Sequence, residues 1–552
     1  MKPESGSRIV IVPTTPFAGQ RPGTSGLRQK TRVFMQPNYL ANFVQSTFNV
    51  IREQSGDLSH HTLVIGGDGR YYNLEAAQII ISIAVANGFG RLLVARSGLM
   101  STPAVSAVIR RRHALGGLVL SASHNPGGVD EDFGIKYNVT NGGPAPESVT
   151  EAIYQETLRI SEYRLCEDAK VDIDREGSTR IASTEVVVID SLHDYCELME
   201  ELFDFTSLRK LFASGFRMTF DAMHAITGPY AQRLLEQKLG APKGTVINGE
   251  PLPDFGGHHP DPNLVRAADL VAQLAAANGP DFGAACDGDG DRNLILGRDF
   301  FVSPGDSLAL IAEHAQNAIP GYREGLSGVA RSMPTSTAAD RVAASLGIKS
   351  YETPTGWKFF GTLLDADLCT ICGEESFGTG SNHVREKDGV WAVLAWLSIL
   401  AHTGKSVEEV VRAHWKKFGR SYYQRHDFEG LDKDAATKMI ELLREKIPTL
   451  AGKEFAGESI ATADDFSYTD PVDGSTTTKQ GIRLLLSDGS RVVFRLSGTG
   501  TSGATLRIYV ERYRNDSGEA DVREMLTPLL RDAKELLKLR ESVGRDEASV
   551  VT

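Results

Sequence analysis

Cysteine is scarce in this chain, which has five cysteines among its 552 residues. An odd and sparse set in so long a chain excludes a disulfide framework. Cys369 and Cys372 form a CxxC pair, but no second pair of cysteines or histidines stands at the spacing of a zinc site. We therefore expect these two residues to be small, half-buried side chains. The cysteines are Cys166, Cys196, Cys286, Cys369 and Cys372.

Long apolar runs and an excess of basic residues are also absent. No stretch of about 18 apolar residues occurs, so we expect no membrane span. The span Arg8–Val12 before Pro13 is too short for a signal peptide. Lys and Arg total 59 against 71 Asp and Glu, a net charge of −12. This balance argues against a general nucleic-acid binder, and we expect a cytoplasmic protein.

What is present is the pattern of a soluble protein with several domains. Hydrophobic residues make up 41% and charged residues 24% of the chain. At about 150 residues per domain, the length suggests three or four domains. Strand-like and helix-like segments alternate, as in Thr62–Ile65, Leu74–Val85 and Leu92–Ala95. This order predicts a mostly parallel sheet covered by helices, and the rhythm restarts about three times.

The pattern of predicted secondary structure changes from Ile460 onward. Short strands joined by polar, Gly-containing turns precede an amphipathic helix over Val522–Leu537. Pro528 leaves open that this helix begins later than its apolar pattern suggests. We therefore predict three consecutive α/β mixed-sheet domains (1–190, 191–304 and 305–410) and a C-terminal α+β domain (411–552).

A serine loop directly follows the predicted strand Gly117–Leu120. Ligands of α/β sheets collect where strands end, so the hydroxyl of Ser123 is a candidate for chemistry there. His124 and Asn125 can donate hydrogen bonds beside it. The loop lacks the G-x-S-x-G pattern of hydrolases. An ordinary Ser/Asn/Pro turn is an equally open interpretation.

A carboxylate loop follows the apolar strand Phe282–Cys286. In an extended segment Asp287, Asp289 and Asp291 point to one face, where three carboxylates repel one another unless a cation joins them. Oxygen ligands suit a hard ion, and Mg²⁺ is the ion that we predict. An EF-hand is excluded, because Arg292 stands where that loop requires glycine.

Two further loops carry polar groups suited to a sugar phosphate. Glu374 and Glu375 lie between glycines and could bind sugar hydroxyls, although a charged surface loop is the alternative. The second loop, from Arg495 to Gly503, matches G-x-G-x-x-G but leads into a strand, which excludes a dinucleotide site. A phosphate cradle, with Arg507 beside it, remains, and so does a plain hairpin turn. The turn from Pro22 to Arg28 is weaker evidence of the same kind.

The motifs together carry a family resemblance. PGTSGLR, SASHNPGG, DGDGDRN, YETPTGWKFF, CGEESFGTGS and RLSGTGTSGATLR occur in order from Pro16 to Tyr509. In this combination the chain closely resembles the α-D-phosphohexomutase superfamily. PTGWKFF and GEESFGTGS favour its glucose-specific, eukaryotic-type phosphoglucomutase branch.

The resemblance implies four domains around a central active-site cleft and a role for each motif residue. Ser123 would carry the phosphoryl group, and with Asp287, Asp289 and Asp291 it would bind Mg²⁺. The other implied catalytic residues are His124, Lys136, Arg28, Arg292 and Lys387. The implied substrate-binding residues are Thr24, Arg28, Ser123, Arg292, Thr355, Gly356, Glu375, Ser376, Lys387, Arg495, Ser497, Gly498, Thr499 and Arg507.

The implied reaction interconverts α-D-glucose 1-phosphate and glucose 6-phosphate. It uses a phosphoserine enzyme, with glucose 1,6-bisphosphate as intermediate and activator. The partners would be small-molecule sugar phosphates, and the family default is a monomer. Two alternatives stay open: a mutase for another hexose or pentose phosphate, and a scaffold role in secretion like that of the parafusin type.

Overall fold

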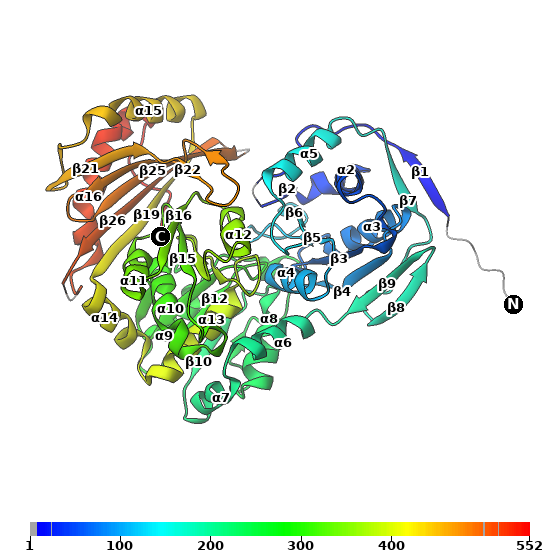
Figure 1. Ribbon diagram of the computed structural model, residues 1–552, viewed down its shortest axis with the longest axis horizontal. Helices are drawn as coiled ribbons and strands as arrows, with labels where there is room; N and C mark the ends of the chain where they lie inside the picture. Colours follow the sequence, from blue (N-terminus) through cyan, green and yellow to red (C-terminus); the bar gives the residue numbers. More distant parts are fainter. Residues whose placement is uncertain (1–7, 24, 501–502, 517) are drawn as a thin grey trace.

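Four large β-sheets follow one another along the described part of the chain, which also has two small two-stranded sheets (Figure 1). The computed structural model describes residues 8–552 apart from residues 24, 501, 502 and 517, and it describes residues 498–500 by their backbone alone. In Figure 1 the first sheet and its helices lie on the right and the fourth sheet lies at the upper left. The predicted series of mixed α/β units followed by an antiparallel unit is confirmed. The three boundaries between the four domains stay a prediction, and position 410 falls within helix α14 (Val407–Phe418).

The first sheet has the order β2-β6-β5-β3-β4-β9-β8. Its four central strands are parallel, because a helix crosses between successive strands. Alternate residues of β3 enter the apolar clusters on the two sides of the sheet, Val64 on one side and Leu63 on the other. The elements are β2 (Leu27–Lys30), α1 (Thr31–Phe34), α2 (Tyr39–Ser55), β3 (Thr62–Gly67), α3 (Asn73–Ala86), β4 (Arg91–Leu99), α4 (Thr102–Arg111), β5 (Gly116–Leu120), β6 (Asp132–Asn138), α5 (Glu147–Thr157), β8 (Gly177–Ile181) and β9 (Thr184–Ile189), with β1 (Ile9–Pro13) paired to β7 (Glu162–Cys166).

The second and third sheets repeat this plan on a smaller scale. Each places parallel strands at one side and ends in an antiparallel hairpin. The second sheet (β11-β10-β12-β13-β14) contains β10 (Met218–Asp221), β11 (Val246–Ile247), β12 (Phe282–Cys286), β13 (Asn293–Gly297) and β14 (Phe300–Val302), with α6 (His193–Leu202), α7 (Phe205–Ala213), α8 (Thr227–Ala231) and α9 (Ala268–Ala275). The third (β16-β15-β17-β18) contains β15 (Gly328–Ser332), β16 (Lys349–Thr353), β17 (Ile371–Gly373) and β18 (Thr379–Ser381), with α10 (Pro304–Ala318), α11 (Ala338–Leu346), α12 (Lys358–Asp365), α13 (Gly389–Thr403) and α14.

One continuous apolar core joins the first three sheets. Helix α13 lies in it with Trp391 and Trp396 fully buried, so this helix is apolar on all sides. Within the described part of the chain, no single helix is long and apolar enough to cross a membrane; α13 and α14 meet that test only as a pair bent by 82°. All five cysteines are free, but Cys369 and Cys372 are fully buried against Trp357 and Phe360, so the expectation of half-buried residues was wrong.

The fourth sheet is antiparallel, with the order β20-β21-β24-β25-β26-β19-β27. Residues of β25 and β26 alternate: even-numbered residues such as Phe494 and Ile508 pack on the helices, and odd-numbered residues such as Arg495 and Arg507 face the third sheet's side. The elements are β19 (Arg420–Leu431), α15 (Lys433–Lys446), β20 (Glu454–Phe455), β21 (Glu458–Asp465), β24 (Ile482–Leu486), β25 (Arg491–Gly500), β26 (Gly503–Arg514), α16 (Val522–Leu537), α17 (Leu539–Val543) and β27 (Val550–Val551), with the small hairpin of β22 (Tyr468–Thr469) and β23 (Thr476–Thr477).

Helix α16 begins where its apolar pattern begins. The Asp521 side chain accepts a hydrogen bond from the backbone N–H of Glu524 and caps the helix. Pro528 lies inside the helix, so the later start that this proline suggested is wrong.

Candidate active site

The serine loop leaves the end of β5 and is held from behind by a buried arginine. Ser123 has a φ of 54°, in the left-handed region that a residue with a Cβ rarely adopts. Its N–H donates to Ser121 Oγ at 2.7 Å, and its carbonyl accepts from Arg70 Nη2 at 2.8 Å. Arg70 also donates to the carbonyl of Asp132 and forms an ion pair with Asp68, and neither side chain of this pair is exposed. The surroundings thus fix the strained serine in place.

The carboxylate loop lies directly against this serine. Ser123 Oγ is 3.0 Å from Asp287 Oδ2, and Asp287, Asp289 and Asp291 bring one oxygen each within 4.8 Å of one another. Burial and the two neighbouring carboxylates raise the pKa of Asp287 well above its ordinary value. Among the described residues, Asp289 Oδ1 and Asp291 Oδ1 have no hydrogen-bond partner although both atoms are buried. Three buried carboxylates, two of which have an unpaired oxygen, fit a divalent cation, so the donor set suits Mg²⁺.

Cationic side chains surround the aspartates. Lys387 Nζ lies 3.2 Å from Asp291 Oδ2. Burial lowers the pKa of Lys387, but Asp291 and Glu374 outweigh burial, so the pKa is raised and the side chain is charged. Arg292 lies 3.9 Å from Asp287 Oδ2, and the partly exposed Arg28 lies within electrostatic range of Asp289.

His124 lies beside the serine in its neutral form. Its Nδ1 is 3.3 Å from Ser123 Oγ. Burial and the charges of Arg292 and Arg28 hold the pKa of His124 well below its ordinary value. A neutral imidazole here can exchange a hydrogen bond with the serine hydroxyl without adding charge.

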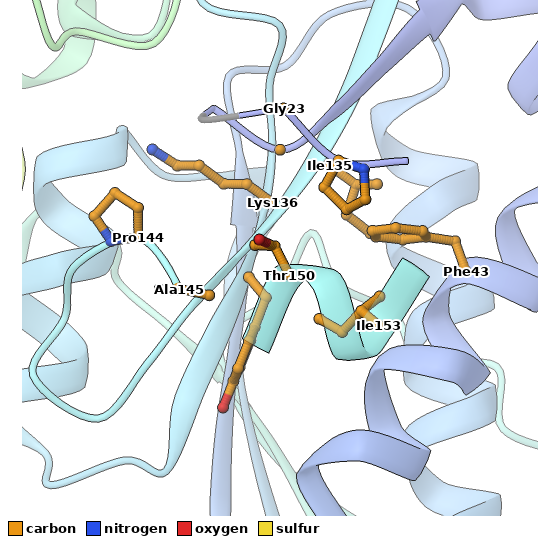
Figure 2. Close-up of a pocket in the computed structure, with 11 residues that line it drawn as sticks. Gly23, Phe43, Ile135, Lys136, Pro144, Ala145, Thr150 and Ile153 are labelled. Carbon is orange, nitrogen blue, oxygen red and sulfur yellow. The ribbon is translucent and has the colours of Figure 1, made fainter. Parts of the chain in front are cut away.

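Lys136 reaches the site from strand β6. Its ammonium is 2.7 Å from Glu386 Oε1 of the third domain, and both side chains are almost fully buried. Figure 2 shows the side chain running away from the apolar residues Phe43 and Ile153, which line a small cavity behind it. Glu386 stands 250 residues along the chain from Lys136, and no sequence signal marked it.

The loop from Gly373 to Gly378, here called the sugar loop, is joined to the carboxylate loop. Arg292 forms an isolated bridge with Gly378, and Asn293 N–H donates to the carbonyl of Phe377 at 2.8 Å. Glu374 accepts from the N–H of Gly356, a residue whose φ of 119° favours glycine.

The two residues that follow Glu374 differ in exposure. Glu375 is buried and accepts from Ser332 Oγ at 2.7 Å. Ser376 is partly exposed, as is Thr355, which precedes Gly356.

The predicted phosphate cradle lies on the odd-numbered face of the fourth sheet. Arg495 donates to Thr355 Oγ1 and to the hydroxyl of Tyr509, which links the cradle to the third domain. Arg507 Nε lies 3.4 Å and Arg425 Nε 2.9 Å from the two oxygens of Asp427. Arg425 and Tyr509 were missed by the sequence analysis. Ser497 is partly exposed; Gly498 and Thr499 are described by their backbone alone, and Thr24 lies outside the described residues.

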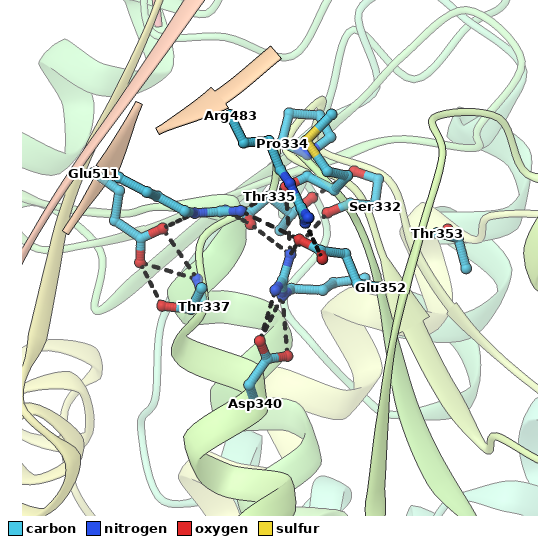
Figure 3. Close-up of polar contacts among 12 residues, drawn as sticks. Ser332, Pro334, Thr335, Thr337, Asp340, Glu352, Thr353, Arg483 and Glu511 are labelled. Carbon is cyan, nitrogen blue, oxygen red and sulfur yellow. Dashed lines mark hydrogen bonds and ion pairs between the residues drawn. The ribbon is translucent and has the colours of Figure 1, made fainter. Parts of the chain in front are cut away.

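The segment Ser332–Thr337 fastens the third domain to the fourth (Figure 3). Arg491 donates to the carbonyl of Met333 at 2.7 Å. Glu511 accepts from the N–H and the hydroxyl of Thr337 at 2.9 and 2.8 Å. Because Ser332 also binds Glu375, the sugar loop and the cradle share this support.

The loop from Pro253 to Pro262, which sequence reasoning missed, lies against the serine loop. The ring of His259 lies 6.2 Å from that of His124, and Asp261 is 3.8 Å from Arg292. The guanidinium of Arg70 lies over the ring of Phe255. The Gly-, Pro- and His-rich run PDFGGHHPDP was the available signal.

Family models match the chain from near its beginning to near its end. The descriptions are phosphoglucomutase/phosphomannomutase alpha/beta/alpha domain I for residues 19–164, domain II for 193–299 and domain III for 304–418. Residues 420–549 match the phosphoglucomutase-1 C-terminal domain.

Named relatives and a solved structure agree with these matches. The chain is 56% identical to a phosphoglucomutase from Rhizobium radiobacter, over 99% of this chain and 100% of that one. It is 51% identical to a probable cytoplasmic phosphoglucomutase from Arabidopsis thaliana, over 99% of both chains. A crystal structure of the Paramecium exocytosis-sensitive phosphoprotein pp63/parafusin in an open form superposes with a TM-score of 0.92, at 48% identity over 99% of both chains.

Proposed function

The chain belongs to the phosphoglucomutase/phosphomannomutase family and is a mutase of the isomerase class that interconverts glucose phosphates, and we propose that it does so by passing a phosphoryl group through Ser123. The substrates would be α-D-glucose 1-phosphate and glucose 6-phosphate. The observation that carries the proposal is the 3.0 Å contact between Ser123 Oγ and Asp287, beside two further buried aspartates.

Asp287, Asp289 and Asp291 would hold the Mg²⁺ ion together with an oxygen on Ser123. Bound there, Mg²⁺ would neutralise charge on the phosphoryl oxygens. The chain's own residues do the remaining work. Arg28, Arg292 and Lys387 place positive charge round the serine, and His124 holds its hydroxyl in a neutral hydrogen bond.

The reaction would proceed in two transfers. In the first, the phosphate ester on Ser123 breaks and its phosphoryl group joins O6 of glucose 1-phosphate, while the O6 hydroxyl loses its proton and Ser123 Oγ gains one, which gives the 1,6-bisphosphate. The intermediate then turns round within the site. In the second transfer Ser123 Oγ takes the phosphoryl group from O1, glucose 6-phosphate leaves, and phosphoserine is restored.

The cradle explains how both orientations could be held. Arg495 and Arg507 lie on adjacent strands, and arginine forks bind phosphate in two-pronged contacts. Whichever phosphate is not reacting would bind there, assisted by Ser497, Gly498 and Thr499. Thr24, Thr355, Gly356, Glu375 and Ser376 would contact the substrate, Glu375 and Ser376 through sugar hydroxyls.

A coupled assay tests the proposal. Purified protein with Mg²⁺, a trace of glucose 1,6-bisphosphate and glucose-6-phosphate dehydrogenase should turn over glucose 1-phosphate, and the intact mass should include one phosphate on Ser123. The Ser123→Ala variant should lose both the phosphate and at least about 10³-fold in kcat. Retention of substantial activity by this variant would refute Ser123 as the phosphoryl carrier.

The remaining alternatives have their own readouts. Comparing kcat/KM for glucose, mannose, glucosamine and ribose phosphates tests the sugar preference. A scaffold role would persist in Ser123→Ala. We propose a cytoplasmic monomer; plant relatives carry both cytoplasmic and chloroplastic names, so localisation by imaging and mass by light scattering are the tests.

A further inference from the structure

The segment from His383 to Asp388 carries two charged side chains to two other domains. Glu386 binds Lys136 of the first domain at 2.7 Å, and Lys387 binds Asp291 of the second at 3.2 Å. The segment is short and has neither helical nor strand hydrogen bonds of its own. Side-chain contacts must therefore fix its shape. In its middle, Arg385 donates its N–H to Ser106 Oγ at 3.0 Å and its guanidinium to the carbonyl of Asn382 at 2.8 Å.

The two ends of the segment are clasped together. His383 Nε2 lies 3.0 Å from Asp388 Oδ2, and neither side chain is exposed. Asp388 also accepts from the hydroxyl of Tyr195 at 2.6 Å and, through the same oxygen, from the N–H of Trp391 at the start of α13. The ring of His383 stacks on that of Trp391.

The hydrogen bonds behind this clasp pair every donor with an acceptor in only one direction. The indole N–H of Trp391 is a donor only, and it donates to the hydroxyl of Tyr322 at 2.9 Å. The Tyr322 hydroxyl then donates to Ser381 Oγ, and Ser381 donates to His383 Nδ1 at 2.6 Å. His383 is left to donate from Nε2 to Asp388. In this direction each of these groups has a hydrogen-bond partner.

Ser381, His383 and Asp388 have the composition of a nucleophilic triad, but a substrate cannot reach them. The carboxylate binds Nε2 and the serine binds Nδ1, both inside the core, where no substrate reaches. A buried network with all of its partners present specifies one local conformation.

We propose that the His383–Asp388 clasp is the positioning device that sets Glu386 and Lys387 for phosphoryl transfer. The inference rests on the proposed mutase function. Since Lys387 faces the aspartates that hold the reacting group, releasing the clasp would displace its charge from the transition state. Displacements of about 1 Å can cost on the order of 100-fold in rate.

The chain offers a matched control. His414 is likewise buried, with its Nδ1 2.7 Å from Glu313, and it lies on α14 away from the segment. His383→Asn and His414→Asn each remove a buried histidine–carboxylate contact, and Glu313 keeps Lys417 as a partner at 2.9 Å. Tyr195→Phe deletes a single hydroxyl from a helix outside the site, so it tests the clasp with little risk to folding.

We expect His383→Asn to lower kcat by at least about tenfold and Tyr195→Phe by about threefold, with KM within about twofold of wild type. His414→Asn should lower the Tm comparably and leave kcat within about twofold. If the kcat of both clasp variants stays within twofold, or falls no more than that of His414→Asn at equal loss of Tm, the inference is overturned. A wild-type protein without turnover would instead overturn the proposed function.

Histidine-selective ¹⁵N NMR gives a readout independent of activity. It should show His383 of the wild type protonated on Nε2, the nitrogen that lies 3.0 Å from Asp388 Oδ2. A ring protonated on Nδ1 alone would have no proton to donate to Asp388 and would overturn the proposal.

Discussion

Replacing Glu511 by glutamine should loosen the attachment of the fourth domain to the third. Burial acts to raise the pKa of Glu511, but Arg491 and Arg341 outweigh burial and lower the pKa from 4.5 to about 2. One pKa unit corresponds to about 1.4 kcal/mol, so the folded protein favours the ionised carboxylate by about 3 kcal/mol. Glutamine imitates the neutral carboxyl, and the variant should lose most of this free energy.

Hydrogen exchange at Thr337 reports the loss directly, because the N–H of this residue donates to Glu511. Exchange in the segment Ser332–Thr337 should speed up on the order of 100-fold at pH 7 in Glu511→Gln. Glu535→Gln, on the exposed face of α16 in the same domain, is the control and should not change it.

The effect has a defined pH dependence. A carboxylate whose pKa is lowered by folding contributes stability that is complete above 4.5 and is lost as the pH falls toward 2. The difference between wild type and variant should therefore shrink below pH 4.5. Exchange within threefold of wild type at pH 7, or a difference equally large at pH 3, would refute the reasoning.

Three further predictions concern the site itself. Arg70→Met leaves Asp68 buried without its partner and should destabilise the protein by about 3–5 kcal/mol in urea unfolding, while the double variant with Asp68→Asn recovers part of this loss. Chelation of divalent metal should abolish turnover and added Mg²⁺ restore it, and Asp291→Asn should raise the Mg²⁺ concentration needed for half-maximal rate by about tenfold or more; an unaltered requirement would contradict the metal assignment. Arg495→Ala removes a charged donor from the cradle and should raise the KM for glucose 1-phosphate about 10- to 100-fold, with partial recovery in Arg495→Lys; an unchanged KM would exclude Arg495 from phosphate binding.

The parts of the site that could be predicted from sequence are the reactive residues that come directly after an apolar strand. Ser123 and the three aspartates directly follow apolar strands, so their position at a sheet edge could be inferred without coordinates. Arg70, Glu386 and Arg425 could not be found in this way. Each acts on groups brought close only by tertiary folding, and one charged residue in a loop or strand gives no local signal.

The fold shows the same limit. Helix α16 was predicted with its bounds because its apolar stripe is regular and Asp521 caps it. Helix α2 was not predicted: its buried face includes Asn42, Gln45 and Thr47, which blur the apolar period. The burial of Cys369 and Cys372 depends on aromatic neighbours elsewhere in the chain, which no short motif reveals.

The strict alternation in β25 and β26 has a consequence for how this protein can change. Substitutions at odd-numbered positions alter the face toward the third sheet and leave the packing under the helices intact. Residues on that face can therefore change one at a time. Inserting or deleting one residue is different in kind. Such a shift would place Arg495 and Arg507 on the apolar face that packs on the helices, and Phe494 and Ile508 on the opposite face. We therefore expect these two strands to tolerate substitutions on the face opposite the helices but not insertions or deletions.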